Sequence, residues 1–414
     1  MYNNFIDEFI DRGYYYQCSN LDLLRDEVSK KKIVAYVGFD CTAKSLHVGN
    51  LMQIMILKLL QKHGHTPIII VGGATTKIGD PTGKDKMRQL ISDEIIAENM
   101  NGIKKSLSKF IQFDKKENSA IILNNSEWLD KINYIQFLRD YGKLFSVNRI
   151  LSIESIKTRL EREEHLTFLE FNYMLLQSYD FYHLHTHYDC SLQFGGSDQW
   201  GNIITGLDFI KKLTGNNVHA ITTPLLTTAS GAKMGKSISG AIWINENMLS
   251  PYDYYQYWRN TEDADVVKFA KLYAEFSVEQ QKEFELLSET NINEAKKRLA
   301  FELTKICHGV DNANDALETA VKLFEQNVAS ENLPTIILTK NELEDGVFIY
   351  DIILRSKITD SKSEGRRIIR GRGVKLNDET VLDENKKIDS TNLQDDQILK
   401  LSIGKKKHIL IKLN

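Results

Sequence analysis

Short β-branched runs alternate with longer amphipathic segments through the first half of the chain. The short runs have the length and composition of buried strands, and the longer segments repeat their apolar residues at helical spacing. Strands are predicted at 33–37, 67–71 and 120–123, and helices at 47–62, 133–140 and 168–182. This alternation predicts an α/β fold with a parallel sheet, which binds its ligand at the carboxyl ends of the strands.

The stretch from Tyr36 to Leu51 joins the first predicted strand to the first long helix. The strand ends at Gly38, a polar turn follows, and His47-Val48-Gly49-Asn50 opens the helix. A helix N-terminus offers backbone N–H groups and the positive end of its dipole to a phosphate. Gly49 has no side chain to keep a nucleotide off the backbone. The stretch favours a nucleotide site, and the alternative is an ordinary strand-to-helix turn.

Two further loops carry cations at positions that suit phosphates. The glycine-rich loop at 72–84 ends in Lys84, and Arg88 follows one turn later; a solvated turn is the alternative.

The loop at 227–240, TTASGAKMGKSISG, contains Lys233 and Lys236. It differs from a P-loop because only three residues separate its first two glycines. We interpret it as a mobile loop that offers two ammonium groups to a leaving pyrophosphate, with an inert surface loop as the alternative.

The helix after Leu166 carries three polar residues on one face. Tyr173, Gln177 and Asp180 are spaced at i, i+4 and i+7 among apolar neighbours, so each needs a partner. An apolar pocket with a few fixed polar groups is typical of a site for a small amphipathic ligand. The alternative is a cluster of internally satisfied hydrogen bonds. Downstream, 193–200 is again a strand that runs into a glycine-rich loop, where Asp198 has the chemistry to accept from ribose hydroxyls.

Three histidines at 183, 185 and 187 have the spacing of metal ligands on a strand. Their segment continues a predicted helix, in which this spacing spreads the rings around the axis. No carboxylate or cysteine lies close enough in sequence to complete a site. We therefore predict no protein-coordinated metal.

Composition places the chain among cytoplasmic proteins with several domains. It has 414 residues, 42% of them hydrophobic and 26% charged, with a net charge of −3. Its four cysteines are far apart and form no CxxC pair, which fits a reducing compartment. The N-terminus carries acidic residues where a signal peptide is basic and apolar, and no apolar run reaches the ~20 residues of a membrane span.

The last part of the chain is locally basic. Residues 351–414 contain 15 Lys and Arg against 10 Asp and Glu. The basic residues at 366–372 fall on a predicted helix and the turn after it, before a strand. These basic residues favour contact with nucleic-acid phosphates, and the alternative is a run of charges exposed to solvent. Upstream, the segment from Pro251 to about Asn327 is predicted to be helical, and Leu333-Pro334 forms a plausible linker.

Taken together, five segments resemble the bacterial-type tyrosyl-tRNA synthetases, which are class I aminoacyl-tRNA synthetases. They are 36–51, 72–88, 173–180, 193–200 and 233–237. His47-Val48-Gly49-Asn50 stands for the HIGH signature and Lys233-Met234-Gly235-Lys236-Ser237 for KMSKS. Asn50 replaces the second histidine and Gly235 the first serine; we expect activity to be intact.

The resemblance covers the whole chain and implies its domains. A Rossmann-like parallel-sheet catalytic domain occupies 1–226, and a KMSKS-type loop with its connector occupies 227–250. An α-helical, anticodon-side domain follows at 251–332. A small α+β RNA-binding domain at 341–414 resembles a fold shared with a ribosomal small-subunit protein.

The resemblance also implies the reaction and its residues. Tyrosine and ATP form tyrosyl-adenylate and pyrophosphate, and the tyrosine is then transferred to the 3′-terminal adenosine of tRNA(Tyr). The implied catalytic residues are Thr42, His47, Lys84, Arg88, Lys233 and Lys236. Those for tyrosine are Tyr36 and Asp180 at its phenol, Asp80, Tyr173 and Gln177 at its ammonium, and Gln193. Those for ATP are Gly38, Asp40, His47, Asn50, Gly196, Asp198, Gln199 and Lys236. Those for tRNA are Arg366, Arg367, Arg370 and Arg372, which meet the long variable arm.

Other implied features concern partners. Mg²⁺ accompanies ATP without a dedicated protein cage. The family is homodimeric, and we expect Leu166–Phe171, with Phe168 at its centre, to form the contact.

Three rival functions remain at this point. A P-loop kinase or NTPase is disfavoured by the spacing before Lys236. A non-catalytic RNA-binding protein leaves 32–240 unexplained. The tryptophanyl enzyme is the nearest relative within the class, but a phenol-reading pair at Tyr36 and Asp180 favours tyrosine.

Overall fold

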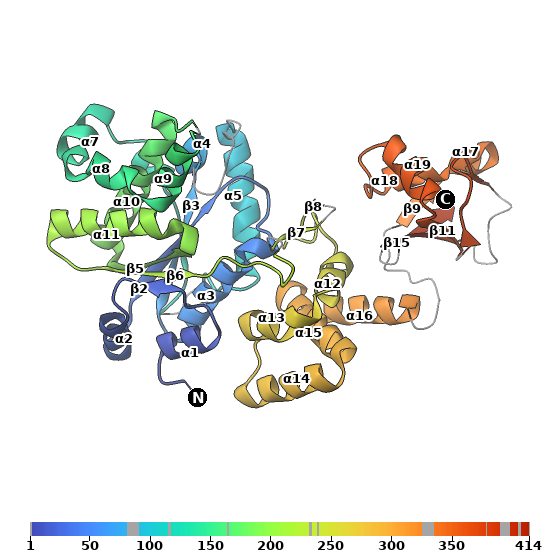
Figure 1. Ribbon diagram of the computed structural model, residues 1–414, viewed down its shortest axis with the longest axis horizontal. Helices are drawn as coiled ribbons and strands as arrows, with labels where there is room; N and C mark the ends of the chain where they lie inside the picture. Colours follow the sequence, from blue (N-terminus) through green and yellow to red (C-terminus); the bar gives the residue numbers. More distant parts are fainter. Residues whose placement is uncertain are drawn as a thin grey trace. The chain divides into compact units, whose positions relative to one another are not determined.

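A six-stranded sheet organises the first half of the chain (Figure 1). In the computed structural model its strand order is β1-β6-β5-β2-β3-β4, with five parallel strands and the antiparallel edge strand β1. The structure describes residues 2–80, 91–114, 117–163, 165–231, 234–237, 240–324, 335–377, 379–389, 398–404 and 407–413. The strands are β1 (Gln17–Cys18), β2 (Val34–Asp40), β3 (Thr66–Gly72), β4 (Ile121–Asn124), β5 (Cys190–Gly196) and β6 (His219–Thr223). The predicted parallel α/β sheet is confirmed.

Helices cover both faces of this sheet. Figure 1 shows α10 and α11 on one side and α1 and α3 on the other. The helices of this part are α1 (Phe5–Asp11), α2 (Leu21–Lys30), α3 (Leu51–Lys62), α4 (Thr75–Ile78), α5 (Asp93–Ser108), α6 (Ser126–Leu129), α7 (Tyr134–Asp140), α8 (Val147–Leu151), α9 (Glu154–Glu161), α10 (Phe168–Tyr188) and α11 (Trp200–Thr214). The 3₁₀ turns are η1 (Val48–Asn50), η2 (Gly142–Leu144) and η3 (Ser197–Gln199).

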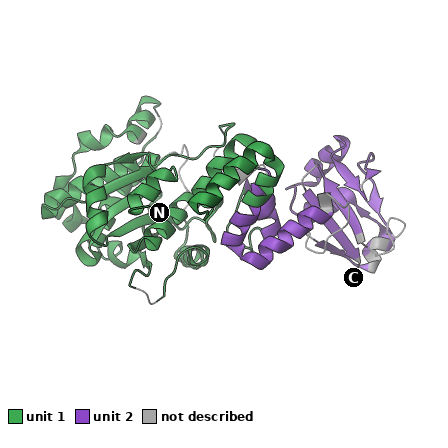
Figure 2. Ribbon diagram, turned by 90° about the horizontal axis from the view of Figure 1, so that it is seen from below, with its two compact units in different colours: residues 1–237, 241–249, 261–299 green, residues 238–240, 250–260, 300–414 purple. Residues whose placement is uncertain are grey.

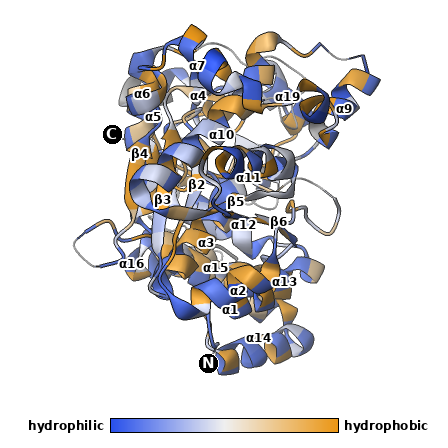
Figure 3. Cartoon of the chain, turned by 90° about the vertical axis from the view of Figure 1, so that its left-hand side faces the viewer, coloured by the Kyte–Doolittle hydropathy of each residue, from blue (hydrophilic) through white to orange (hydrophobic). Residues whose placement is uncertain are grey.

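Burial explains why the central strands have near-continuous apolar sequences. Six of the seven residues of β3 are buried because helices pack on both faces of the sheet. Helix α3 is likewise apolar along most of its length, and in Figure 3 it is largely orange. Helix α10 begins at a capping box in which Thr167 and Glu170 bond each other's backbone, and it ends at the left-handed residue Asp189.

The chain divides into two compact units (Figure 2). The first comprises 1–237, 241–249 and 261–299, and the second 238–240, 250–260 and 300–414. The remaining elements of the first unit include β7 (Lys236–Ser237), η4 (Asp263–Asp265), α13 (Val266–Tyr273) and α14 (Val278–Thr290). Strand β8 (Gly240–Ala241) and helix α15 (Ile292–His308) cross the division.

The second unit contains a small five-stranded sheet in the order β12-β11-β14-β15-β9. One core of Ile, Leu and Val side chains joins this sheet to α18 and α19. Its helices are α12 (Pro251–Arg259), α16 (Val310–Phe324), α17 (Lys340–Asp345), α18 (Ile349–Arg355) and α19 (Lys362–Arg370). Its strands are β9 (Thr335–Leu338), β10 (Val347–Phe348), β11 (Val374–Leu376), β12 (Glu379–Thr380), β13 (Lys387–Ile388), β14 (Ile398–Ile403) and β15 (Lys407–Leu413). The basic segment forms α19 and the turn before β11, as predicted. The Leu333-Pro334 linker lies outside the described residues.

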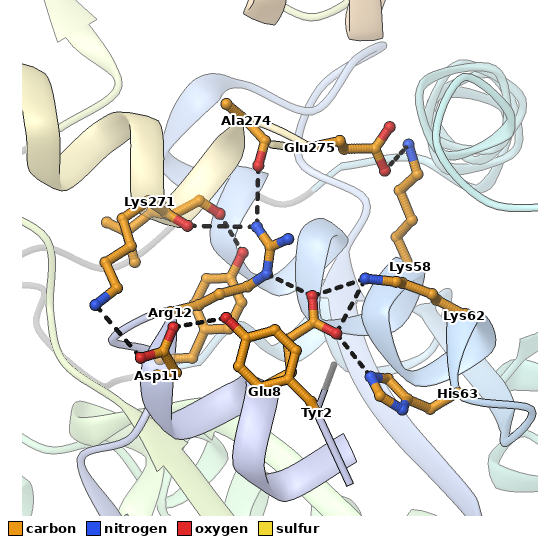
Figure 4. Close-up of polar contacts among 12 residues, drawn as sticks. Tyr2, Glu8, Asp11, Arg12, Lys58, Lys62, His63, Lys271, Ala274 and Glu275 are labelled. Atoms are coloured by element: carbon orange, nitrogen blue, oxygen red, sulfur yellow. Dashed lines mark hydrogen bonds and ion pairs between the residues drawn. The ribbon is translucent and has the colours of Figure 1, made fainter. Parts of the chain in front are cut away.

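A buried carboxylate joins α1 to α3 within the first unit (Figure 4). Glu8 is 1% exposed and accepts from Arg12 Nε at 2.9 Å, Lys62 Nζ at 2.8 Å and His63 Nε2 at 2.8 Å. Burial opposes its ionisation, but the hydrogen bonds from His63, Lys62 and Arg12 outweigh burial and hold the pKa of Glu8 at about 2. The guanidinium of Arg12 also donates to the carbonyl of Ala274, at the end of α13.

Candidate active site

A cavity of about 210 Å³ opens at the carboxyl ends of β2 and β5. These two strands are neighbours, and the chain continues outward from them in opposite directions, toward β3 and toward β6. Ligands of parallel sheets bind where the strand order reverses in this way. All six residues predicted to bind the amino acid line the cavity: Tyr36, Asp80, Tyr173, Gln177, Asp180 and Gln193.

Asp180 is a buried carboxyl group that lines this cavity. Its Oδ1 accepts from Trp128 Nε1 at 2.7 Å and its Oδ2 from Asn125 Nδ2 at 3.0 Å. Burial raises the pKa of the Asp180 carboxyl from 3.8 to about 7, although both hydrogen bonds act in the opposite direction. Each oxygen keeps a second lone pair, so the carboxylate has acceptor capacity for a ligand.

Tyr36 faces the same cavity from β2. Its side chain is 2% exposed, and its hydroxyl has no hydrogen-bond partner among the described residues. Burial, assisted by the negative charge of Asp180, raises the pKa of the Tyr36 phenol well above its usual value. A buried hydroxyl without a partner costs free energy, so this group is poised to bond a polar ligand atom.

A chain of side-chain hydrogen bonds fixes the polar groups at the other end of the cavity. Gln199 Nε2 donates to Asp80 Oδ2 at 2.8 Å, while Asn202 Nδ2 donates to Gln177 Oε1 at 3.1 Å and to Gln199 Oε1 at 3.3 Å. Tyr173 donates its hydroxyl to Asp40 Oδ1 at 3.4 Å. This end therefore presents carboxylate and amide oxygens, which suit a cationic group.

Five of the eight residues predicted for the nucleotide line the cavity: Gly38, Asp40, Asn50, Gly196 and Gln199. His47 and Asp198 do not line it. The side chain of the eighth, Lys236, lies outside what the structure describes. His47 caps η1, where the amide of Asn50 accepts from its backbone N–H. The Asp198 carboxylate lies against Gly196, since a Cβ there would be 2.5 Å from Asp198 Oδ1.

Several predicted catalytic residues cannot be placed on this cavity. Thr42 is exposed and does not line it. Lys84, Arg88 and Lys233 lie outside the described residues. The backbone of Lys236 begins β7, but its side chain is outside what the structure describes.

The four predicted RNA-binding arginines differ in their surroundings. Arg366 stacks over the ring of Tyr350 at 4.3 Å, and Arg370 pairs with Glu384 at 2.5 Å. The side chain of Arg367 is 80% exposed, with Glu364 at 3.9 Å, and Arg372 is also exposed.

The residues that orient Asp180 were not predicted from the sequence. Asn125 and Trp128 follow β4, far from Asp180 in sequence, and Asn125 also bonds Thr75 and the backbone N–H of Ala74. One signal was present: polar residues directly after a parallel strand lie at the edge that binds ligands. Gln53 was missed too; it lines the cavity, and its Oε1 is buried without a partner in the described part of the chain.

The three histidines lie on α10, as the helical prediction required. His183 stacks on Trp128 and on His187, each at 4.2 Å, whereas His185 Nδ1 bonds the carbonyl of Cys190. Within the described ranges, no group of three or more His, Cys, Asp or Glu is arranged to hold a metal ion. The helices that the structure describes include none long and apolar enough to cross a membrane.

Two family models together match most of the chain. The family "tRNA synthetases class I (W and Y)" matches residues 28–325, and "Tyrosine--tRNA ligase SYY-like C-terminal domain" matches residues 325–411. The first match contains the whole cavity described above.

Individual relatives agree with these matches. The tyrosine–tRNA ligase of Rickettsia africae (strain ESF-5) is 60% identical over 99% of this chain and 100% of its own length. The C-terminally truncated mitochondrial tyrosyl-tRNA synthetase of Aspergillus nidulans is 28% identical, with a TM-score of 0.71 over 78% of this chain and 95% of that one. Its counterpart from Coccidioides posadasii is 29% identical, with a TM-score of 0.67 over 77% and 92%.

The raised pKa of Asp180 predicts a pH-dependent loss of stability. The folded protein prefers the protonated carboxyl, so stability should fall as the pH rises from about 3.8 to about 7. Trp128→Phe removes one donor to the carboxylate and should raise the pKa of Asp180 further, which extends the loss to higher pH. Calorimetric Tm values should therefore fall more steeply for Trp128→Phe than for the wild type above about pH 7.

The same substitution in an Asp180→Asn background is the matched control. There the pH-dependent part of the Trp128→Phe effect should vanish. An equal pH dependence in both backgrounds would contradict the assignment of the shift to Asp180.

Proposed function

Because the chain belongs to the bacterial-type, class I tyrosyl-tRNA synthetases and is therefore a tyrosine–tRNA ligase, we propose that the cavity between β2 and β5 is its activation site. The enzyme activates L-tyrosine with ATP to give tyrosyl-adenylate and pyrophosphate. It then transfers tyrosine to the 3′-terminal adenosine of tRNA(Tyr).

The observation that carries the proposal is the unpaired hydroxyl of Tyr36 beside the buried carboxylate of Asp180. A substrate phenol can donate to Asp180 and accept from Tyr36, which satisfies all three groups at once. Phenylalanine lacks the hydroxyl and leaves both protein groups unpaired. Tyrosyl-tRNA synthetases are the standard example of selectivity that arises in this way.

At the opposite end, Asp80, Tyr173 and Gln177 bind the tyrosine ammonium. The hydrogen bonds from Gln199 to Asp80 and from Asn202 to Gln177 hold these oxygens in place before the substrate arrives. Such preorganisation lowers the cost of ordering the site on binding. Gln193, which is buried on β5, completes the wall of this part of the cavity.

The chemistry requires no protein nucleophile. A carboxylate oxygen of tyrosine attacks the α-phosphorus of ATP, and the bond to pyrophosphate breaks. The enzyme accelerates this step by aligning the two substrates and stabilising negative charge on the phosphorus centre and the leaving group.

The residues proposed to bind the nucleotide are Gly38, Asp40, Asn50, Gly196, Asp198 and Gln199. Thr42, His47, Lys84, Arg88, Lys233 and Lys236 contact its phosphates, and Mg²⁺ enters with ATP as a counter-charge.

The proposed domain division separates the chemistry of tyrosine activation from most of the binding of tRNA. Residues 1–226 with the loop at 227–250 carry out activation, and 251–332 with 341–414 serve tRNA. The basic α19 supports this assignment, since exposed arginines contact RNA phosphates.

We further propose a cytoplasmic homodimer. Exposed apolar side chains gather on α7, α9 and α10, including Ile135 at 70% and Phe168 at 67% exposure. Figure 3 shows apolar segments on α7. The inner sides of these helices share one core with α8, so their outer sides belong to one region of the surface. Phe168 and Leu169 fall within the predicted contact, Leu166–Phe171.

Tyr36→Phe should weaken discrimination between tyrosine and phenylalanine. Loss of the hydroxyl leaves the bound phenol short of one partner, so kcat/KM for tyrosine should fall by about tenfold to a hundredfold. The value for phenylalanine should change little. Pyrophosphate exchange with each amino acid measures both constants, and Tyr179→Phe, which is adjacent to Asp180 but outside the cavity, is the control. An unchanged ratio of kcat/KM for tyrosine to kcat/KM for phenylalanine in Tyr36→Phe would contradict the assignment of Tyr36 to the phenol.

Arg367→Ala should weaken tRNA binding and reduce its salt dependence. Each lost phosphate contact lowers the slope of log affinity against log salt by about 1. Filter binding of tRNA(Tyr) over a salt series gives this slope. Lys30→Ala removes an exposed cation from α2 and serves as the control. If both variants keep the wild-type slope, Arg367 does not contact tRNA.

Phe168→Glu should dissociate the dimer, because it buries a charge at the centre of an apolar contact. Analytical ultracentrifugation at micromolar concentration should show a dimer for the wild type and a monomer for the variant. Leu286→Glu changes a side chain of similar exposure, 62%, on α14 and should leave the dimer intact. A monomeric wild type would rule out the proposed assembly.

A further inference from the structure

The described parts of the loop that follows β6, 227–231 and 234–237, contact the 3₁₀ turn η4 and the helix α13 that follows it. Three contacts hold the first half of the loop. The backbone N–H of Ala229 donates to Asp265 Oδ2 at 2.7 Å, and Lys268 Nζ donates to the carbonyl of Thr227 at 3.0 Å. The hydroxyl of Ser230 donates to Glu262 at 2.6 Å. The acceptor Asp265 is buried, whereas the contacts of Ser230 and Lys268 are exposed.

Met234 attaches the second half of the loop to the same helix. Its side chain is 8% exposed, and its sulfur accepts from the hydroxyl of Tyr273 at 3.6 Å. Tyr273 is fully buried in the last turn of α13. The backbone N–H of Met234 donates to the carbonyl of Leu226 at 3.3 Å. Met234 is buried although Lys233 and Lys236 lie close to it in the sequence. A fully solvated loop would not bury an apolar side chain, so Met234 holds this part of the loop against the protein.

Gly235 brings the loop backbone onto the turn that begins α3. Its φ is +94°, and a Cβ there would lie 2.6 Å from the backbone nitrogen of Gly49 and 3.2 Å from His47 Nδ1. A Cβ on Gly49 would in turn lie 3.2 Å from the carbonyl oxygen of Met234. The positive φ and the backbone clash require glycine at 235, and a side chain at 49 would crowd the carbonyl oxygen of Met234. Lys236 follows directly in sequence.

Helix α13 is itself held against α1 and α3. Arg12 donates to the carbonyl of Ala274 at 3.0 Å, and the hydroxyl of Tyr14 donates to the carbonyl of Leu272. Lys58 of α3 pairs with Glu275 at 2.7 Å (Figure 4). Helix α3 and the loop therefore both contact α13 or the residues at its ends, which holds the loop close to α3.

We propose that Met234, Gly235 and Tyr273 form a seat that positions the 227–237 loop against the His47–Asn50 turn for adenylate formation. They are positioning residues, because they act through the backbone that carries Lys236. The inference rests on the proposed function of this loop toward pyrophosphate. Interactions that become stronger in the transition state, where negative charge develops on the pyrophosphate, raise the rate constant more than they raise substrate affinity. A displaced seat should therefore slow adenylate formation and leave tyrosine binding unchanged.

The loop offers a matched pair of glycines for the test. Gly231 has a φ of +85°, and a Cβ there would meet nothing within 4 Å, so Gly231→Ala carries the backbone strain of Gly235→Ala without its clash. Single-turnover adenylate formation in Gly235→Ala should be slower than in Gly231→Ala by about tenfold or more. The Kd for tyrosine, from equilibrium dialysis without ATP, should be that of the wild type in both.

A second set of variants tests the anchor. Met234→Ala should slow adenylate formation, and Met234→Leu, which restores the buried volume, should recover most of the rate. Tyr273→Phe should have a small effect in the wild type and none in the Met234→Leu background, because leucine offers no acceptor. A general loss of folding would also weaken tyrosine binding. Slower adenylate formation in Met234→Ala, its recovery in Met234→Leu and an unchanged Kd for tyrosine would therefore indicate a specific effect on the loop.

Lys236→Ala separates failure of the seat from failure of the proposed function. If Lys236→Ala is slow while Gly235→Ala matches Gly231→Ala and Met234→Ala matches the wild type, the seat is overturned and the role of the loop stands. If Lys236→Ala forms adenylate at the wild-type rate, the loop has no such role and the seat falls with it. Loss of tyrosine affinity in Met234→Ala that Met234→Leu does not restore would also overturn the seat.

Discussion

The proposed active site depends on one buried carboxylate whose ionised form is stabilised by two hydrogen-bond donors. Asp180 is 4% exposed, and burial alone would keep it protonated well above its ordinary range. Trp128 and Asn125 each donate to one of its oxygens, and each oxygen keeps a second lone pair. In the proposed site this carboxylate binds the phenol of tyrosine. The Tyr36 hydroxyl, which has no partner among the described residues, makes binding of a ligand without a hydroxyl unfavourable.

The fold brings these groups together from distant parts of the chain. Tyr36 comes from the central strand β2, and Asp180 from α10, which packs across the sheet. Asn125 and Trp128 come from the end of β4, two strands away from β2. The same Asn125 also bonds the turn after β3, so the orientation of Asp180 is tied to the edge of the sheet at which we propose that both substrates bind.

Sequence patterns predicted the parallel sheet through strands β2 to β5 and the helices α3, α7 and α10, but not strands β1 and β6. The family resemblance supplied Tyr36 and Gln193. Tyr173, Gln177 and Asp180 were predictable because helical spacing alone puts them on one face. Asn125 and Trp128 were not, because no periodicity relates a short turn after one strand to a helix about fifty residues later. The contact of Gly235 with Gly49 was equally hidden, since it depends on where α13 holds the loop. Thr42, chosen by resemblance, is exposed and does not line the cavity.

A crystal structure of the enzyme with L-tyrosine bound tests the central claim most directly. The account predicts that the phenolic oxygen lies within about 3.2 Å of both the Tyr36 hydroxyl and an Asp180 carboxylate oxygen. It also predicts that Trp128 and Asn125 keep their bonds to Asp180. A tyrosine ring bound elsewhere, or a phenol that touches neither group, would contradict it.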